Sequence, residues 1–401
     1  MAWYREVHGQ AWKNLAAAGL GWMLDGMDVM LYAFALTSIQ QEFGLSSGAA
    51  GGLASLVLVS SAVGGAAAGA LADRFGRARV LLWSILAYSL FTGATATART
   101  VAELAVWRTL VGLGLGGEWS AGSVLVAESW PARHRGKAIG FMQGGWAIGY
   151  ILAALLAAVV LPRYGWRPLF AIGVAPALLT LWIRRSIPEP SIWKRGQAAG
   201  FRGVFQHGLW RRTLLATALT TVVLFAYWGL FTWIPAYLAS PAARGGAGLG
   251  MVRSTAWIVP MQIGAFFGYT LFGVAADRFG RRPVFLVFML AAAILAPAYG
   301  LWARHEIALL VLGPLVGFFG HGYFSVFGAM LAELFPTRVR ATAQGLCYNS
   351  GRALSALAPL GIGWLAERRG LGPALASTSV FFLAGALIML ALPETKGRTL
   401  E

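Results

Sequence analysis

The amino-acid sequence predicts an all-α membrane protein whose twelve transmembrane helices form two pseudo-symmetric six-helix bundles. Three observations support this fold class. Hydrophobic residues make up 58% of the chain and charged residues only 12%, which is about half the charged fraction of a soluble domain. Apolar runs of membrane-spanning length recur along the whole chain. Two motifs of the first half also return in the second half.

The apolar runs are each close to the roughly 20 residues with which a helix crosses a bilayer. We expect spans at residues 15–37, 49–72, 79–98, 101–129, 137–161, 166–183, 213–238, 254–276, 283–303, 307–335, 341–366 and 372–392. Most connections are short and polar, but the connection over 184–212 carries seven Lys or Arg residues. The chain therefore divides into an N-terminal bundle (1–183), a cytoplasmic linker (184–212) and a C-terminal bundle (213–401).

The net charge of +17 would be compatible with nucleic-acid binding, but its distribution argues against that function. If the amino terminus is cytoplasmic and the spans alternate, the cytoplasmic side holds 22 of the 32 Lys and Arg residues, the opposite side 8 and the membrane 2. Multi-pass membrane proteins show this positive-inside asymmetry. We expect a monomer in the lipid bilayer of a bacterial-type cytoplasmic membrane, with both termini in the cytoplasm and no nucleic-acid partner.

Two repeated motifs relate the halves of the chain. Gly69–Arg77 reads GALADRFGR, and Gly273–Arg281 reads GVAADRFGR after an offset of 204 residues. Ala127–Arg135 reads AESWPARHR and returns as AELFPTRVR in Ala332–Arg340, at an offset of 205. Two motifs with nearly the same offset indicate two halves of common architecture, as in many secondary transporters.

The charges of these motifs fall at the cytoplasmic ends of the expected spans. They could form a conformational latch that pairs in one state of the protein and separates in the other. Glu128 with Arg133, and Glu333 with Arg338, are further candidate pairs of this latch. The alternative is a solvated charge cluster that only sets the topology, but its repetition in both halves favours the latch. The latch candidates are Asp73, Arg74, Arg77, Glu128, Arg133, Asp277, Arg278, Arg281, Glu333 and Arg338.

Asp25 and Asp28 lie in the middle of the first expected span, three residues apart and therefore on one helical face. A carboxylate at membrane depth costs roughly 2.5 to 3.5 kcal/mol on insertion scales, and such residues usually mark an ion or substrate path. We expect one or both to bind and release a coupling proton. The alternative is a structural charge that an arginine or backbone donors satisfy.

Arg108 and Glu118 lie inside the fourth expected span. Arg108 is about two turns from the outer end, where it could pair with a first-span aspartate and release it on protonation. It could also reach the outer headgroups as a snorkelling side chain. Glu118 is ten residues further along and does not share its face. It is equally compatible with a second protonation site and with a buried, hydrogen-bonded acid.

Arg352 lies near the middle of the eleventh expected span, with Tyr348 and Asn349 on the same helical face. A guanidinium in a low-dielectric site is a good bidentate receptor for a carboxylate, sulfonate or phosphate. The alternative is a structural salt bridge, but no acid stands out at that depth in the last six spans. We therefore expect Arg352 to bind an anionic substrate.

Other polar or amphipathic side chains inside the spans could line a central cavity. Each one alone could equally be a packing residue or an interface anchor. His321 is the only histidine inside a span, and it could relay protons or be a hydrogen-bonded core residue. The lining candidates are Tyr32, Gln143, Trp146, Tyr227, Trp228, Gln262 and Tyr323.

The repeated GxxADRFGR segment between the second and third spans resembles the signature of the major facilitator superfamily, and the resemblance covers essentially the whole chain. The fourth-span segment Arg108–Trp119, RTLVGLGLGGEW, also resembles a motif of this superfamily. The resemblance implies two six-helix bundles around a central site. Sugar-porter-like members place an arginine at the position of Arg108, near a first-span aspartate.

Two shorter segments resemble subfamilies of that superfamily. Leu24–Asp28, LDGMD, is similar to the Asp-Gly-x-Asp motif of the aromatic-acid:proton, sialate:proton and metabolite:proton symporters. The segments PEPS at Pro188–Ser191 and PETKG at Pro393–Gly397 resemble the ends of the two halves in sugar-porter-like members. The first resemblance implies proton-driven import, and the second extends the candidate substrates to sugars.

We therefore expect a proton-coupled symporter that imports a small organic anion, a carboxylate, by alternating access. The sequence has no Walker-type phosphate loop and no His or Cys spacing suited to a metal, so we expect neither an enzyme nor a cofactor. Three alternatives stay open. They are a proton-coupled sugar or polyol carrier, a non-transporting sensor on the same scaffold, and drug efflux by exchange.

Overall fold

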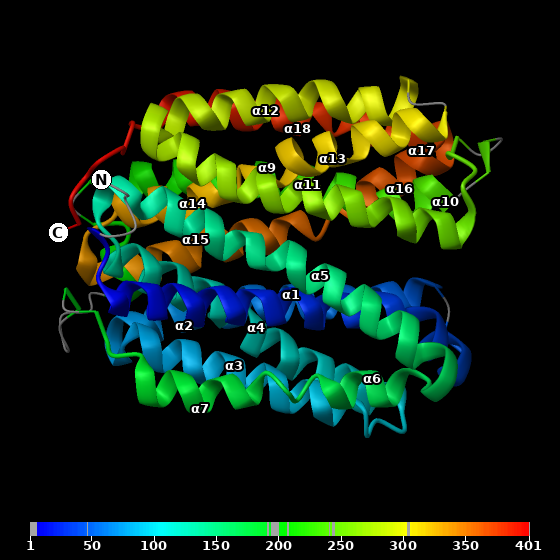
Figure 1. The fold of residues 1–401 in the computed structure, drawn as a ribbon, viewed down its shortest axis with the longest axis horizontal. Helices are drawn as coiled ribbons and strands as arrows, with labels where there is room; N and C mark the ends of the chain where they lie inside the picture. The colour runs from blue at the N-terminus through cyan, green and yellow to red at the C-terminus, as the bar shows by residue number, and fades with distance from the viewer. Residues whose placement is uncertain are drawn as a thin grey trace.

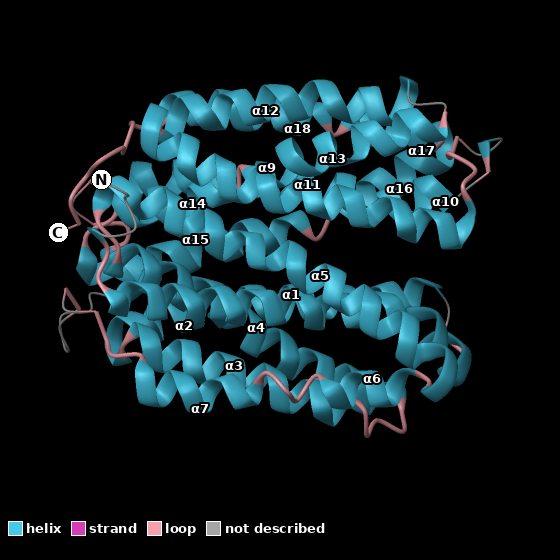
Figure 2. Ribbon diagram, viewed as in Figure 1, coloured by secondary structure: helices cyan, strands magenta, loops and turns pink. Residues whose placement is uncertain are grey.

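The computed structural model describes residues 6–45, 47–190, 192–193, 200–206, 208–239, 241–242, 245–302 and 305–400. Residues 191, 194–199 and 207 of the expected linker therefore lie outside the description. Helices form nearly all of the described chain, and no strand occurs in these residues (Figure 2). The long helices run along one common axis, and both termini lie at the same end (Figure 1). We call that end the terminal side and the opposite end the far side.

Figure 1 shows the helices in two groups that follow the order of the chain. The first group packs α1 on α4 and α5, and α2 and α3 on α4. Its elements are α1 (Gly9–Phe43), α2 (Ser47–Phe75), α3 (Arg77–Thr95), α4 (Val101–Ser129), a 3₁₀ turn (Ala132–His134), α5 (Arg135–Tyr164), α6 (Trp166–Ile172) and α7 (Ala177–Ser186). We call this group the N-half.

The second group, the C-half, packs α11 on α13 and α9 on α15 and α18. A short helix, α8 (Gly200–Gly203), precedes it. Its elements are α9 (Trp210–Phe231), α10 (Ile234–Ala239), α11 (Gly250–Phe279), α12 (Arg281–Pro297), a π-helical turn (Ala298–Trp302), α13 (Glu306–Gly322), α14 (Ser325–Leu334), a 3₁₀ turn (Thr337–Val339), α15 (Arg340–Ser355), α16 (Ala358–Arg369), α17 (Leu371–Ser377) and α18 (Ser379–Ala391).

Several expected spans are built from two helical segments. The sixth is α6 with α7, the seventh α9 with α10, and the eleventh α15 with α16. Pro176, Pro235 and Pro359 lie at the starts of the second segments. Proline is tolerated in the first turn of a helix, where its missing N–H would have no partner, but it interrupts a helix that continues through it. The prolines therefore account for these breaks.

Ten stretches of the described chain are long and apolar enough to cross a bilayer. They correspond to every expected span except the first and the eleventh. The first span, α1, carries Asp25 and Asp28, and the eleventh consists of α15 and α16, which have 16 and 12 residues. The two expected spans that are not among these ten long, apolar stretches are thus the two that carry most of the candidate site.

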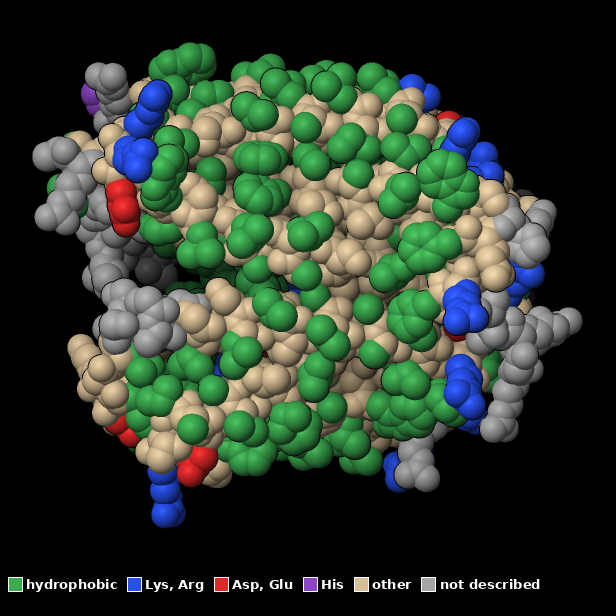
Figure 3. Space-filling view, turned by 180° about the vertical axis from the view of Figure 1, so that it is seen from behind, with side chains coloured by type: hydrophobic (Ala, Val, Ile, Leu, Met, Phe, Trp, Pro, Cys, Tyr) green, Lys and Arg blue, Asp and Glu red, His purple; other side chains and the backbone are tan. Residues whose placement is uncertain are grey.

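The outer surface is suited to lipid. Hydrophobic side chains cover the middle of the face in Figure 3, whereas Lys and Arg side chains lie toward its two ends. Ile307, Leu178 and Val311 are among the exposed apolar side chains, with 76%, 69% and 60% of their surface accessible. Figure 3 also shows a hollow between the two halves on the far side. The chain is an all-α, multi-pass membrane protein.

The two halves meet through α2 on α15 and α5 on α11. Small residues make this approach possible, as is common between membrane helices. A Cβ atom added at Gly69 would overlap the carbonyl oxygen of Ala341, and one added at Gly273 would overlap that of Gly136. The first glycine of the repeated motif therefore allows close backbone contact with the other half in both copies.

Gly116 is expected to tolerate no larger side chain, because α2 and α4 touch backbone to backbone there. A Cβ at this position would overlap the carbonyl oxygen of Ser61. Overpacking of this kind costs about 1–3 kcal/mol, so Gly116→Val should lower the melting temperature of the purified protein. Gly361→Ala on α16 is the control, because a Cβ there meets no atom within 4 Å. Equal melting temperatures for both variants would contradict this packing.

Candidate functional site

Five charged side chains of the sequence prediction are buried inside the helical bundle. Asp25 and Asp28 come from α1, Arg108 and Glu118 from α4, and Arg352 from α15. Each retains 8% or less of its accessible surface. A charge that is so far removed from water requires a compensating partner, and the partners divide these five residues into two groups.

The first group joins Asp28 to Arg108. The Arg108 Nη1 atom lies 3.9 Å from the Asp28 Oδ2 atom, and the Thr92 hydroxyl donates a 2.6 Å hydrogen bond to Asp28 Oδ1. The guanidinium lies 4.7 Å from the ring centre of Tyr32 and 5.7 Å from that of Phe170. Within the described chain, Asp28 Oδ2 and Arg108 Nη1 form no hydrogen bond. The pair is thus held close without direct contact.

The second group brings Asp25 and Glu118 close to Arg352. Asp25 interacts electrostatically with Arg352, Asp28 and Glu118, and Glu118 interacts with Arg352 as well. Arg352 Nη1 donates a 3.4 Å hydrogen bond to the Ser61 hydroxyl. Since Asp25 and Glu118 belong to the N-half and Arg352 to the C-half, this group bridges the two halves.

Glu118 is fully buried, and neither of its carboxyl oxygens has a hydrogen-bond partner among the described residues. It faces Gly21 of α1, where an added Cβ atom would come within 2.5 Å of Glu118 Oε1. An ionised carboxylate in this position would lose its hydration without gaining a donor. The geometry therefore suits a carboxyl group that carries a proton, or one whose charge Arg352 compensates.

Tyr348 and Asn349 tie α15 to α4. The Tyr348 ring stacks on Trp119 with a centroid distance of 3.8 Å and an interplanar angle of 20°. Trp119 Nε1 in turn donates a 3.0 Å hydrogen bond to Gln143 Oε1. Asn349 Nδ2 donates to the Ser120 hydroxyl over 3.3 Å. Tyr348 and Asn349 thus contact the N-half, whereas Gln143 holds Trp119 within the N-half.

The remaining lining candidates are aromatic or amide side chains of both halves. Trp146 lies beside Trp22, with ring centres 4.9 Å apart. His321 is enclosed by Phe231 and Tyr227, with ring centres 4.0 Å and 5.1 Å away, and its Nδ1 atom lies 3.1 Å from the Gly317 carbonyl oxygen. Its Nε2 atom is buried without a hydrogen-bond partner among the described residues, so only one ring nitrogen is hydrogen-bonded.

Tyr323 and Gln262 occupy different surroundings in the C-half. Tyr323 packs against Phe324, with ring centres 4.8 Å apart, and more loosely against Phe285 and Phe382. Gln262 is buried, and its Oε1 atom accepts no hydrogen bond within the described chain. The Tyr323 hydroxyl is likewise buried without a hydrogen-bond partner among the described residues, and buried polar atoms of this kind are candidate contacts for a ligand.

Two residues of α3 belong to the site although sequence reasoning did not find them. Thr92 holds Asp28, and Tyr88 interacts electrostatically with Glu118, Asp25 and Asp28. Tyr88 is fully buried, and its hydroxyl has no hydrogen-bond partner among the described residues. The two side chains share one helical face because they are four residues apart. Two polar side chains four residues apart in an apolar span are the feature of the sequence that indicates such a site.

A second network of charges lies at the terminal side and joins the halves. Glu128 accepts hydrogen bonds from Arg77 Nε over 2.9 Å and from Arg340 Nη1 of the other half over 2.6 Å. Glu333 accepts from Arg281 Nη2 over 3.0 Å and from Arg135 Nη1 of the other half over 2.9 Å. The two copies of the motif thus make equivalent pairs across the interface.

The motif aspartates cap helices of the opposite half. Asp73 accepts a 2.8 Å hydrogen bond from the Thr342 backbone N–H at the start of α15, and a 2.6 Å bond from the Thr342 hydroxyl. Asp277 accepts from the backbone N–H groups of Gly136 and Lys137 at the start of α5, over 2.9 Å and 2.8 Å. A carboxylate at a helix N-terminus satisfies free N–H donors and interacts favourably with the helix dipole.

The pairing differs from the expected one at four arginines. Arg133 contacts Glu6 rather than Glu128, and Arg338 forms no salt bridge with any described residue. Both lie on the 3₁₀ turns that follow Pro131 and Pro336, whereas Arg135 and Arg340, which begin the next helices, point back into the interface. Arg74 and Arg278 are exposed and lie over the neighbouring rings of Phe75 and Phe279.

The comparison with known proteins agrees with this architecture. The family model "Major Facilitator Superfamily" matches residues 18–259 and 252–400, which together are nearly the whole chain. The chain belongs to the Major Facilitator Superfamily. Members of this superfamily are membrane transporters rather than enzymes, so the chain is a transporter.

Individual proteins match this superfamily member over nearly their full length. A putative metabolite transport protein of Haemophilus influenzae is 35% identical, with 99% of each chain covered. The cis,cis-muconate transport protein of Acinetobacter baylyi is 33% identical over 97% of this chain and 96% of its own. Among solved structures, the proton:xylose symporter XylE has a TM-score of 0.82 at 21% identity and 98% coverage of both chains, which shows the shared fold.

Two further acids of this superfamily member cap helices at the terminal side. Glu189 accepts hydrogen bonds from the backbone N–H groups of Arg77, Ala78 and Arg79 at the start of α3. Glu394 accepts from those of Arg281 and Arg282 at the start of α12. The sequence showed a Pro-Glu pair after the sixth and twelfth spans but gave no indication of this capping role.

Glu394 is expected to stabilise the protein in a pH-dependent way. Partial burial disfavours its ionised form, but four backbone N–H donors outweigh burial and hold its pKa below the ordinary value of 4.5. A lowered pKa means that the stabilisation is present above pH 4.5 and is lost as the pH falls through the lowered pKa. The melting temperature of Glu394→Gln should therefore lie below that of the wild type at pH 7, and the two should converge in acid.

The matched control for this measurement is Glu367→Gln, which replaces an exposed acid on α16. Its melting temperature should follow that of the wild type across the same pH range. A constant difference between Glu394→Gln and the wild type from pH 7 into acid would contradict the capping role of the ionised carboxylate.

Proposed function

We propose that this transporter is a proton-coupled symporter that imports a small organic anion, a carboxylate, by alternating access. The observation that carries the proposal is the buried Arg352, which contacts Ser61 of the other half and interacts electrostatically with two buried carboxyl groups, Asp25 and Glu118. Intramembrane charges of this kind mark substrate and proton paths. The muconate transport protein among the relatives acts on a dicarboxylate, which supports an acidic substrate.

Charge balance at Arg352 links the substrate to the proton. With Asp25 and Glu118 both ionised, the three groups already carry one excess negative charge, and a bound carboxylate would add another in a low-dielectric site. Protonation of the two acids frees Arg352 to pair with the substrate by a bidentate contact. The anion therefore binds best together with protons, which is the requirement for symport.

Asp28 and Arg108 provide a second proton-linked contact. The 3.9 Å separation between Arg108 Nη1 and Asp28 Oδ2 is short enough for attraction between the ionised forms. A proton on Asp28 removes that attraction and frees Arg108, so that α1 and α4 can shift within the N-half. Tyr88 and Thr92 lie beside these acids and could pass the proton between them.

Alternating access would use the terminal-side network as the conformational latch. All inter-half ion pairs described above, and both capping aspartates, are intact, so the structure is closed at the terminal side. We place this side in the cytoplasm on the basis of the positive-inside distribution of Lys and Arg. In this proposal the halves are residues 1–183 and 213–401, the connection over 184–212 is the cytoplasmic linker, and a monomer is sufficient.

The decisive experiment measures flux of the purified protein in proteoliposomes with radiolabelled cis,cis-muconate as the probe. We expect uptake when the proton gradient is directed into the proteoliposome, and we expect uptake to stop when a protonophore is added. Competition by xylose but not by benzoate would favour a sugar carrier instead. Saturable binding without flux would favour a sensor. An uptake rate that does not depend on the pH gradient would contradict proton coupling.

A further inference from the structure

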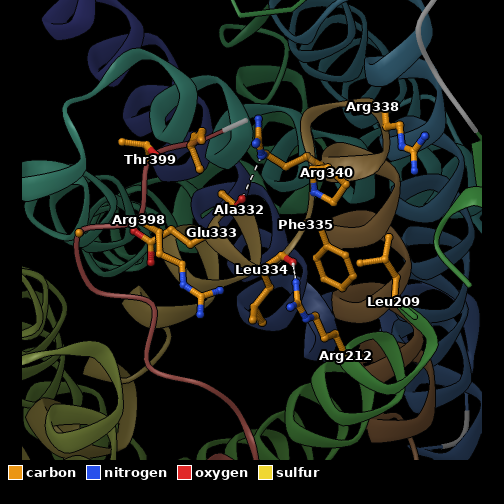
Figure 4. Close-up of a pocket in the computed structure, with 13 residues that line it drawn as sticks. Leu209, Arg212, Ala332, Glu333, Leu334, Phe335, Arg338, Arg340, Arg398 and Thr399 are labelled. Carbon is orange, nitrogen blue, oxygen red and sulfur yellow. Dashed lines mark hydrogen bonds between the residues drawn. The ribbon is translucent and has the colours of Figure 1, made fainter. Parts of the chain in front are cut away.

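A cavity of about 630 Å³ opens at the terminal side, well away from the buried site between α1 and α15. Its walls come from the start of α9, the end of α14 with the following loop, and the C-terminal segment after α18 (Figure 4). Its volume lies within the range of small-molecule sites. The three segments are far apart in the sequence and come together at this cavity.

The lining of this cavity carries excess positive charge. Arg212, Arg338, Arg340 and Arg398 face it together with one acid, Glu333. Glu333 is already occupied, because it accepts hydrogen bonds from Arg135, Arg281 and the Thr395 hydroxyl. Arg340 is occupied by Glu128. The charges of the other arginines are not balanced by the acids of the cavity.

The uncompensated arginines are available to a ligand. Arg338 and Arg398 are exposed and form no salt bridge with the described residues. Arg212 uses its Nη1 atom for a 3.1 Å hydrogen bond to the Leu334 carbonyl oxygen. Figure 4 shows Arg212 and Arg398 on either side of Leu334. Arginine is the residue best suited to phosphate groups, because its planar fork donates two parallel hydrogen bonds.

The cavity is also connected to the latch between the halves. Arg135 of the N-half donates a 3.1 Å hydrogen bond to the backbone carbonyl oxygen of Arg398, which holds the C-terminal segment in place. Glu333 and Arg340, the C-half members of both inter-half pairs, form part of the cavity wall. Separation of the halves would remove Arg135 from the C-terminal segment and so take away one support of the cavity.

We propose that this cavity binds a phosphate-bearing polyanion and that the bound anion keeps the terminal side closed. The ligand is either a soluble phosphate compound or the headgroup of an anionic phospholipid. A ligand that binds one of two conformations more tightly shifts the population toward it, so the anion stabilises the closed latch. Its binding is independent of the transported substrate. The expected slowing of transport, however, rests on the function proposed above.

The test uses the full chain in nanodiscs of phosphatidylcholine, with pyrophosphate as the soluble probe and calorimetry as the readout. Arg338→Ala combined with Arg398→Ala should weaken pyrophosphate binding by about tenfold or more, since two charge-assisted contacts are lost. Arg185→Ala combined with Arg202→Ala is the control, because it removes two exposed terminal-side arginines outside the cavity. The control should bind pyrophosphate as the wild type does.

A second arm separates the two sources of phosphate. Nanodiscs that contain phosphatidylglycerol should raise the melting temperature of the wild type without added pyrophosphate if the occupant is a lipid headgroup, and the cavity double variant should lose that gain. Pyrophosphate binding without a lipid effect identifies a soluble ligand. If the wild type binds neither probe, or if the cavity variant and the control respond alike, the cavity is not a phosphate site.

Flux measurements then test the link to the latch. Pyrophosphate enclosed in proteoliposomes, at the terminal side of the protein, should slow muconate uptake by the wild type but not by the cavity double variant. Equal slowing of both would overturn the proposed control of the latch. Because binding is measured without any transport, failure of the proposed transport function would leave the calorimetric result intact and would be recognised separately.

Discussion

Replacing Arg352 by alanine is expected to abolish substrate binding, and with it substrate-dependent uptake. Arg352 keeps only 8% of its accessible surface, and in the proposed mechanism its guanidinium is the partner of the substrate carboxylate. Removing one member of a buried charge pair costs about 2–5 kcal/mol, which corresponds to a loss of affinity between about thirtyfold and several thousandfold. The measurement is muconate binding by calorimetry, followed by uptake in proteoliposomes.

Arg352→Lys distinguishes the geometry of the contact from its charge. Lysine keeps the positive charge close to Asp25 and Glu118 but lacks the planar fork that binds a carboxylate through two hydrogen bonds. We therefore expect an intermediate affinity for this variant. Arg369→Ala removes an exposed arginine on α16 and should bind muconate normally. Wild-type affinity in Arg352→Ala, with an unchanged melting temperature, would refute the role of Arg352 as substrate receptor.

The positions of the intramembrane charges in the sequence predict their burial, but only the family resemblance suggests a partner, a first-span aspartate for Arg108, and it does not say which one. Asp25, Asp28, Arg108 and Arg352 stand out because each interrupts an apolar span, and burying a charge is costly unless it is functional or paired. Which acid lies nearest to which arginine depends on how α1, α4 and α15 pack. A spacing of 80 residues between Asp28 and Arg108 contains no information about that geometry.

The terminal-side network shows the same limit. The repeat identifies the acids Glu128 and Glu333, but the predicted partners are Arg133 and Arg338, whereas Arg340 and Arg135 form the pairs between the halves. In the structure Glu128 pairs with Arg340, 212 residues away, because the 3₁₀ turn after Pro131 directs Arg133 outward toward Glu6. Pairing across two docked halves is a tertiary property, and local spacing predicts only contacts within one helix.

Polar residues that serve the backbone were the hardest to assign. Glu189 and Glu394 cap the starts of α3 and α12 from segments more than 100 residues further along the chain. Capping usually uses a residue next to the helix that it caps, so no local pattern announces it here. The recurrence of Pro-Glu after each half was visible, but only the coordinates connect it to the start of a helix.

Replacing Asp28 by asparagine is expected to abolish proton-driven accumulation of substrate while leaving substrate binding largely intact. Asparagine has nearly the same shape and still accepts the hydrogen bond from Thr92, but it cannot take up a proton or carry the charge that attracts Arg108. The substrate contact at Arg352 is on α15 and is not altered directly. Uptake driven by a pH gradient should therefore disappear, whereas exchange of labelled for unlabelled muconate at equal pH should persist.

The control variant for these uptake and exchange measurements is Glu42→Gln. It removes a far-side acid that pairs with Arg167 at the surface. It should accumulate muconate as the wild type does, because the surface pair is solvated and contributes little. Accumulation by Asp28→Asn at the wild-type rate would exclude Asp28 as the coupling residue. Loss of both accumulation and exchange, with binding retained, would instead show that Arg108 without its counter-charge arrests the halves, since an unpaired buried cation favours whichever conformation best hydrates it.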